Sequence, residues 1–401
     1  MLSTPSENPR ALFKVATAAT EARPTPARTS AGSKLAARRI LLVQTQAENA
    51  GAQEISRLLG AGLRERGYEV FNLFFFRKSD SFDEPPNTFY CAPRRPGTVW
   101  AFARFLWSLA RQIRTIRPDA VMTFQHYGNI FGGAVSRLVS SAPVIANEVS
   151  AGASMSWPVR AADIALGSLG VFNCITLNSR DMEREYARYP ASYRARMTHV
   201  AHGFDDKSLD LPREEARRRF GLPQEVTLLG CTARLHPGKR LDAAIRLLAR
   251  EPGWHLALAG QGADEGRLKG LAAELEVTDR VHFVGELPPQ RIGEFLASLD
   301  VFVFPSAAET FGLAAVEAAG AGIPAVVSDL PVLREVLAID GKPAALFVDP
   351  ADTSKFASTV SRLLGDSDLR NELRQNAKGL KSRYSVNAMV DEYVGILQRF
   401  L

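Results

Sequence analysis

Short apolar runs, many of them rich in β-branched residues, alternate with segments of helical periodicity along this 401-residue chain. Runs that are apolar on both faces and alternate with helices are typical of buried parallel strands joined by right-handed crossovers. The twelve predicted strands are residues 40–43, 70–75, 120–124, 144–146, 174–177, 198–201, 227–231, 255–259, 281–284, 301–304, 325–327 and 345–348. Because twelve strands are more than one sheet comfortably holds, the pattern predicts an α/β protein with two Rossmann-like, doubly wound domains.

The boundary between the two domains is expected after the sixth run, near His202-Gly203-Phe204-Asp205. This places a tail over 1–37, an N-terminal domain over 38–205 and a C-terminal domain over 206–385. In open parallel sheets, ligands bind beyond the carboxyl ends of the strands. Two such domains facing each other would form an interdomain cleft, so the loops after the strands are the first place to look for chemistry.

Most of the net charge of the chain sits in its tail. Residues 1–39 carry seven basic and two acidic side chains, which accounts for +5 of the formal +6. The rest of the chain is close to neutral, which argues against a nucleic-acid partner. The tail lacks the apolar core of a secretory signal, so we expect an uncleaved, disordered tail, with an organellar transit peptide as the alternative.

Two further observations concern location. No apolar stretch is long enough to cross a bilayer. The cysteines Cys91, Cys174 and Cys231 lie far apart and form no metal-binding or redox spacing. A reducing, cytoplasmic location is the simplest interpretation.

The loop and helix after the strand at 301–304 are the most informative segment. Glu309 lies in the loop, a helix begins near Leu313, and the first amides of that helix are donors suited to an anion or to sugar hydroxyls. Glu317 follows in the first turns of the same helix. An isolated acidic pair of this kind more often balances the helix dipole or is solvated. The surrounding pattern favours two carboxylates facing the cleft.

Two other loops carry candidate ligand groups. Arg234 and Lys239 follow the strand at 227–231, and a guanidinium fork with an ammonium group suits a diphosphate, although such residues are often ordinary surface charges. The loop after the first strand contains Gly51 and opens a helix, which allows close approach of a phosphate or a sugar. It lacks the glycine triplet of a dinucleotide fingerprint, and an ordinary strand–helix turn is the alternative.

Residues from about 198 to 385 resemble the nucleotide-sugar-binding half of glycosyltransferase family 4 (glycosyl transferases group 1), retaining enzymes with the GT-B fold. The first half matches more loosely, through Asn49-Ala-Gly51, Arg66-Gly-Tyr-Glu-Val70 and Pro118-Asp119. The marks of the second half are Arg234 with Lys239, Ala259-Gly-Gln-Gly262, Val281-His-Phe-Val-Gly285, Phe304-Pro-Ser306, Glu309 to Glu317 and Gly322-Ile-Pro324.

Carried over by position, the resemblance implies a donor site. Arg234 and Lys239 would hold the diphosphate and stabilise charge on the leaving nucleotide, Glu317 would bind the ribose, and Gly51 would line the phosphate side. The transferred sugar and its phosphate would be held by Glu309 with the amides of Phe311, Gly312 and Leu313. His126 would lie near the reacting sugar, with a capping or core histidine as the alternative.

The resemblance further implies an enzyme that transfers a sugar from a nucleotide-diphosphate sugar, with retention, to a saccharide or lipid-linked saccharide acceptor in cell-envelope or exported polysaccharide or glycolipid synthesis. It also implies a last helix, 386–401, that crosses back onto the first domain. Two positions depart from the family pattern, His202-Gly-Phe-Asp205 and Asn147-Glu148, and both lie toward the acceptor or the hinge. The alternatives are a GT-B epimerase or phosphorylase, and a non-catalytic nucleotide-sugar-binding protein.

We expect no cofactor and no required metal. The one metal-like motif, Asp366-Ser-Asp368, precedes a helical pattern and is interpreted as a helix cap. The segment 94–117 is basic, aromatic and amphipathic. It predicts either a core-packed helix with a solvated arginine face or a helix lying on an anionic membrane surface, which would make the protein peripheral on the inner face of the cytoplasmic membrane.

Overall fold

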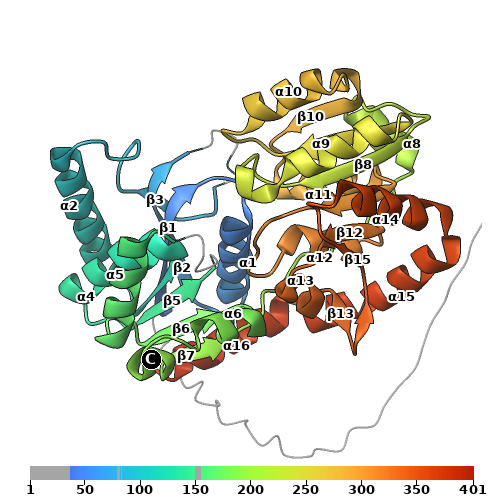
Figure 1. Ribbon diagram of the computed structural model, residues 1–401. Coiled ribbons are helices and arrows are strands. Elements are labelled where there is room, and N and C mark those ends of the chain that lie inside the picture. Colours follow the sequence, from blue (N-terminus) through green and yellow to red (C-terminus); the bar gives the residue numbers. More distant parts are fainter. Residues whose placement is uncertain (1–36, 79–81, 83, 150–154) are drawn as a thin grey trace, which may run out of the picture. The chain divides into compact units, whose positions relative to one another are not determined.

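The computed structural model describes residues 37–401, except 79–81, 83 and 150–154. The prediction for the tail, 1–37, therefore falls almost entirely outside the described residues. Two parallel sheets dominate the described part of the chain, each with helices on its faces (Figure 1). The predicted two-sheet α/β fold is confirmed.

The first sheet has seven strands in the order β3-β2-β1-β4-β5-β6-β7. All its pairs are parallel, as in β1 and β4, where Ile40 lies opposite Ala120. The six predicted strands of this half are present, and β3, which lies at the edge of the sheet, was not predicted. The strands are β1 (Arg39–Ala47), β2 (Glu69–Arg77), β3 (Thr88–Tyr90), β4 (Ala120–Phe124), β5 (Val144–Glu148), β6 (Cys174–Leu177) and β7 (Met197–His199).

The second sheet has six parallel strands in the order β10-β9-β8-β11-β12-β15, and all six were predicted. A small antiparallel pair, β13 with β14, was not. The strands are β8 (Thr227–Thr232), β9 (Trp254–Ala259), β10 (Val281–Gly285), β11 (Val301–Phe304), β12 (Ala325–Ser328), β13 (Ala338–Ile339), β14 (Lys342–Pro343) and β15 (Leu346–Val348).

The helices cover both faces of the two sheets because each buries one apolar stripe against them. In the first half they are α1 (Gly51–Glu65), α2 (Val99–Ile116), α3 (Gln125–Tyr127), the π-helical turn Gly128–Gly133, α4 (Ala134–Val139), α5 (Trp157–Ser168), α6 (Arg180–Tyr186) and α7 (Ala191–Arg194). In the second half they are α8 (Arg213–Arg219), α9 (Leu241–Arg250), α10 (Glu265–Glu274), α11 (Ile292–Ala297), α12 (Leu313–Gly320), α13 (Pro331–Val336), α14 (Thr353–Gly365), α15 (Ser367–Arg383) and α16 (Val386–Gln398), with 3-10 turns at Pro237–Lys239, Thr278–Arg280 and Pro289–Arg291.

The last helix, α16, packs on the first sheet rather than on the second (Figure 1). Met389, Val390 and Tyr393 are buried in one cluster with residues of α1 and β1. Gly62 of α1 permits this contact, because a Cβ at that position would lie 2.5 Å from the Val390 side chain. We call the first sheet with its helices and α16 the N-terminal lobe, and the second sheet with its helices the C-terminal lobe.

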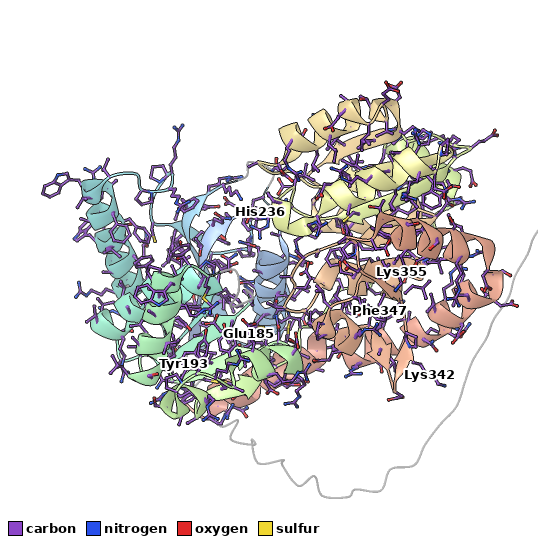
Figure 2. The ribbon with its side chains drawn as sticks, in the orientation of Figure 1. Glu185, Tyr193, His236, Lys342, Phe347 and Lys355 are labelled. Carbon is purple, nitrogen blue, oxygen red and sulfur yellow. The ribbon has the colours of Figure 1, made fainter. Side chains whose placement is uncertain are left out.

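Two carboxyl groups are buried together in the core of the N-terminal lobe. Glu148 ends β5 and Asp163 lies on α5, and they are 1% and 0% exposed. Asn129 donates to Glu148 Oε1 at 2.7 Å, and Tyr193, labelled in Figure 2, donates to Asp163 Oδ2 at 2.9 Å. Burial, together with the charge of Asp163, raises the pKa of Glu148 well above its usual range, and burial raises that of Asp163 as well. The folded pair therefore retains a proton that the unfolded chain releases.

This retained proton predicts a stability that falls as the pH rises. Below about pH 4, where free carboxyl groups are protonated, the contribution is complete. Between that value and the raised folded pKa values, each retained proton costs about 1.4 kcal/mol per pH unit. We expect Asp163→Asn to reduce the dependence of stability on pH, because an amide can donate to Glu148 at every pH. The measurement is the melting temperature from pH 4 to 8, with exposed Asp279→Asn as the control. A constant difference between wild type and Asp163→Asn across that range would contradict the prediction.

Candidate donor-binding cleft

A cavity of about 600 Å³ lies where loops from the carboxyl ends of both sheets meet. One side comes from the loop after β1 and the start of α1, and the other from loops after β8, β9 and β11. The predicted site residues that line this cavity are Gly51, Arg234, Lys239, Glu309, Phe311, Gly312, Leu313 and Glu317. The structure thus brings together segments that were predicted separately from distant parts of the sequence.

Gly312 shapes the amide-rich turn at the start of α12. Its φ of +80° lies in the left-handed region, and a Cβ there would meet the Leu333 side chain at 2.4 Å. Glycine is therefore the residue that this turn requires. Phe311, Gly312 and Leu313 line the cavity at this turn. The first amides of a helix lack intrahelical acceptors, so they favour an anion or hydroxyl oxygens.

Lys239 and Glu309 form an ion pair in the wall of the cavity. The Lys239 ammonium lies 2.5 Å from Glu309 Oε1 and 5.4 Å from the centre of the Phe304 ring. Lys239 is held by a 3-10 turn in which the His236 ring accepts from the Gly238 amide. The ammonium is thus fixed by a carboxylate and an aromatic face before any ligand binds.

Arg234 is held against the loop after β9 by a close approach of the two backbones. Gly260 has a φ of +147°, and a Cβ there would lie 1.9 Å from the Ala233 carbonyl oxygen. Leu235 N also donates to Gln261 O at 3.0 Å. The loops after β8 and β9 are therefore in backbone contact, and Arg234 of the first loop lines the cavity.

Glu48 is a cavity residue to which the sequence analysis assigned no role. It follows β1 and is 5% exposed, yet it bridges the two lobes, because its Oε1 accepts from Arg234 at 3.3 Å. Lys78 donates to its other oxygen at 2.6 Å, and Gln46 donates to Oε1 at 2.6 Å. The Glu48 carboxylate is thus paired with Arg234, the arginine that was predicted to bind phosphate. Its place directly after the first strand, at the ligand-binding edge, is the signal that could have identified it.

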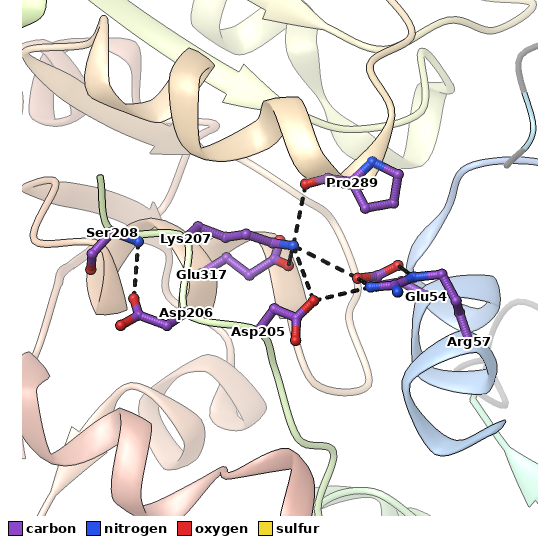
Figure 3. Close-up of polar contacts among 8 residues, drawn as sticks. All are labelled: Glu54, Arg57, Asp205, Asp206, Lys207, Ser208, Pro289 and Glu317. Atoms are coloured by element: carbon purple, nitrogen blue, oxygen red, sulfur yellow. Dashed lines mark hydrogen bonds and ion pairs between the residues drawn. The ribbon is translucent and has the colours of Figure 1, made fainter. Parts of the chain in front are cut away.

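Lys207 was also missed, and it lies beside Glu317 (Figure 3). Its ammonium is 3.9 Å from Glu317 Oε1, and both side chains are buried. Burial raises the pKa of Glu317 to about 8, and the charge of Lys207 opposes that rise. Nothing in the local sequence Asp205-Asp206-Lys207 distinguishes this lysine from a solvated one, so no signal was available.

The structure does not bring His126 into the lining of the cavity. Its neighbour Gln125 lines it instead, while Nδ1 of His126 is buried without a hydrogen-bond partner and burial lowers the pKa of the ring. His202 does line the cavity, and its ring lies 5.3 Å from that of Phe311. Burial lowers the pKa of His202 to about 3, which keeps it neutral. A role of His126 near the reacting sugar stays a prediction.

The helix-cap interpretation of Asp366-Ser-Asp368 is confirmed, because Asp366 caps α15 by accepting from the Leu369 amide at 2.9 Å. In the part of the chain that the structure describes, no group of three or more His, Cys, Asp or Glu side chains is arranged to hold a metal ion.

Solved structures with the same architecture cover nearly the whole chain. Sucrose-phosphate synthase from Thermosynechococcus elongatus matches with a TM-score of 0.77 at 21% identity, over 90% of this chain and 98% of that one. The Anabaena protein Alr3699/HepE in complex with UDP-glucose matches with a TM-score of 0.77 at 17% identity, over 90% and 99%. The fold is therefore that of the GT-B class, as predicted.

The family resemblance is confirmed for the C-terminal lobe. Residues 212–380 match the family described as glycosyl transferases group 1. The D-inositol 3-phosphate glycosyltransferase of Acidothermus cellulolyticus is 34% identical over 194 residues, which is 45% of this chain and 43% of that protein. The chain thus spans less than half the length of this curated relative.

Proposed function

We propose that this protein is a retaining glycosyltransferase that transfers a sugar from a nucleotide-diphosphate sugar to an acceptor hydroxyl. The observation that carries the proposal is the polarity of the cavity. Arg234, Lys239 and the first amides of α12 supply positive charge at one part of its wall, and Glu317 supplies a carboxylate at another. The positive part of the wall suits a diphosphate, and the carboxylate suits the hydroxyls of a ribose. A nucleoside diphosphate carries both groups in one molecule.

The chemistry follows from the same charges. Cleavage of a sugar–phosphate bond builds oxocarbenium character on the sugar and negative charge on the departing diphosphate. Arg234, Lys239 and the α12 amides would stabilise that negative charge, and because they are already fixed by the fold, little reorganisation is needed. Glu309 would orient both the ammonium of Lys239 and the sugar. Retention through front-face transfer rests on the family resemblance.

The proposed acceptor is a saccharide or lipid-linked saccharide in cell-envelope or exported polysaccharide synthesis. Support comes from the names of similar proteins, among them WaaG, a glycosyltransferase involved in lipopolysaccharide biosynthesis (TM-score 0.72, 16% identity). We retain 38–205 and 206–385 as the proposed domains that bind acceptor and donor.

The direct test measures binding of UDP, GDP and ADP by calorimetry, followed by turnover of nucleotide sugars that carry the preferred base. We expect one diphosphate to bind, its sugar to be hydrolysed slowly without acceptor, and the product anomer to match that of the donor by NMR. Binding without turnover would favour a non-catalytic protein, and an altered donor sugar would favour an epimerase. Failure to bind any of the three would overturn the proposal.

We further propose that the protein works at the cytoplasmic face of an anionic membrane, through α2. The helix buries Phe105, Leu109 and Ile113 on one stripe and leaves Trp100 and Trp107 85% and 62% exposed on another. Arginine side chains share that exposed surface, and a groove on it is lined by Trp107, Arg111, Arg114, Thr115 and Arg117. Exposed tryptophan beside arginine suits the headgroup region of an anionic bilayer.

No helix formed by the described residues combines the length and apolar character that crossing a bilayer requires. The cysteines Cys91, Cys174 and Cys231 are buried and unpaired, which supports the proposal of a reducing compartment.

The membrane proposal predicts that Arg111→Gln/Arg114→Gln weakens binding to vesicles that contain phosphatidylglycerol. A basic residue near an anionic surface contributes about 1 kcal/mol, so loss of two lowers the partition coefficient about thirtyfold. Cosedimentation with phosphatidylcholine vesicles, with and without phosphatidylglycerol, measures it. The matched control is Arg246→Gln/Arg250→Gln on the exposed face of α9. Equal partitioning of the two double variants would rule α2 out as the membrane contact.

A further inference from the structure

A buried lysine lies at the centre of a cluster of charges where the two lobes join (Figure 3). Lys207 is 8% exposed, and its ammonium lies within 4 Å of three carboxylates: 3.7 Å from Glu54, 3.6 Å from Asp205 and 3.9 Å from Glu317. It also donates to the Pro289 carbonyl oxygen at 3.3 Å. Burial of an ammonium group is unfavourable unless the group is paired, so Lys207 needs its carboxylates.

The three carboxylates do not depend on Lys207 equally. Glu54 and Asp205 each have a second cation, since Arg57 lies 2.7 Å from Glu54 and 3.0 Å from Asp205. Among the ion pairs and hydrogen bonds of the described residues, Lys207 is the partner of Glu317. Glu317 is also more deeply buried than Asp205. The carboxylate that faces the cavity is therefore the one that relies on this lysine.

The balance of charge in the cluster selects the kind of ligand. Three carboxyl groups face two cations, Lys207 and Arg57, so the cluster carries one net negative charge when all three are ionised. Such a site favours hydroxyl donors and disfavours a phosphate, in contrast to the part of the cavity that holds Arg234 and Lys239. A vicinal diol donates two hydrogen bonds to an ionised carboxylate. A protonated carboxyl group has lost part of this accepting capacity, and burial pushes the Glu317 pKa to about 8 against the opposing charge of Lys207.

We propose that Lys207 is a positioning residue for ribose recognition: it orients the Glu317 carboxyl group and favours its ionised form, which accepts from the ribose hydroxyls of a nucleoside diphosphate. The inference rests on the proposed function and adds to it a residue from the segment that connects the lobes. Because Lys207 also contacts Glu54 of α1, the ribose site of the C-terminal lobe is braced by the N-terminal lobe.

The test compares binding of a nucleoside diphosphate with that of its 2′,3′-dideoxy counterpart, using whichever of UDP, GDP and ADP the wild type binds most tightly. We expect the wild type to prefer the ribose form by about ten- to hundredfold, the range that hydrogen bonds to a charged group supply. In Lys207→Met this preference falls toward one. Lys381→Met is the matched control, because its ammonium pairs with exposed Asp206 in the neighbouring segment. Lys207→Gln, which retains a donor for Pro289, answers the question if the methionine variant does not fold.

A merely structural role for Lys207 would weaken both ligands alike and leave the preference for ribose intact. Retention of the wild-type preference in Lys207→Met or Lys207→Gln therefore overturns the inference while leaving the proposed function in place. Combining Lys207→Met with Glu317→Ala is the second arm, in which we expect no further loss of preference beyond that of Glu317→Ala. An additional loss would show that Lys207 acts on the ribose by another route. A wild type that binds none of the three diphosphates overturns the proposed function and this inference with it.

Discussion

Replacing Lys239 by alanine is expected to lower kcat about 100- to 1,000-fold, the range seen when one preorganised group that stabilises developing negative charge is removed. The ammonium is fixed by Glu309 and by the face of Phe304, so it meets the diphosphate without rearrangement. Charge on the diphosphate grows as the sugar leaves, and an interaction that strengthens in the transition state appears in kcat more than in binding. Initial rates at saturating donor, with calorimetric binding of the nucleoside diphosphate, separate the two quantities.

The matched control for this prediction is Lys269→Ala, which removes an exposed lysine of the same lobe that pairs with Glu265. It should leave both kcat and binding near the wild-type values. A kcat for Lys239→Ala within tenfold of wild type, in a variant whose melting temperature is unchanged, would mean that Lys239 does not act on the leaving group.

Glu317→Ala has the opposite signature. We expect nucleoside diphosphate binding to weaken about ten- to hundredfold, corresponding to about 1.5–3 kcal/mol for hydrogen bonds to a charged group. The ribose is remote from the bond that breaks, so kcat at saturating donor should change little. The variant should fold, because Lys207 keeps Glu54 and Asp205 as partners.

Calorimetry with UDP, GDP and ADP measures the loss, and Glu274→Ala, an exposed glutamate at the end of α10, is the control. Unchanged affinity in Glu317→Ala would remove this carboxylate from the nucleotide site. Comparison of Glu317→Ala with Lys239→Ala thus distinguishes binding of the ground state from stabilisation of the transition state.

The strands of the fold were predictable because each carries its own signal. Runs such as 120–124 and 301–304 coincide with β4 and β11, since a parallel strand covered on both faces is apolar throughout. β3 and the β13–β14 pair were not predicted, and β13 and β14, with two residues each, are too short to show a period.

The loops that line the cavity were predictable for a related reason. Arg234, Lys239, Glu309 and Gly312 lie in loops that follow β8 and β11, and their residue types match the chemistry of a diphosphate and a sugar. The topology of an open parallel sheet then carries all such loops to one edge. The position of each loop after its strand was therefore enough to predict that these loops lie at the same edge of the sheet.

The charges that meet between the lobes were not predictable in this way. Glu48 reaches Arg234 across 186 positions of the sequence, and Lys207 meets Glu54 and Glu317 from a segment with no periodicity. Local sequence patterns indicate which face of a strand or helix is buried. They do not indicate which loops of two separate sheets are in contact. The amino-acid order thus specified two sheets and the set of loops that line the cavity. The partners of those loops, and the burial that shifts the pKa of Glu317, arise only when the lobes pack together, because pairing and desolvation depend on distances in space.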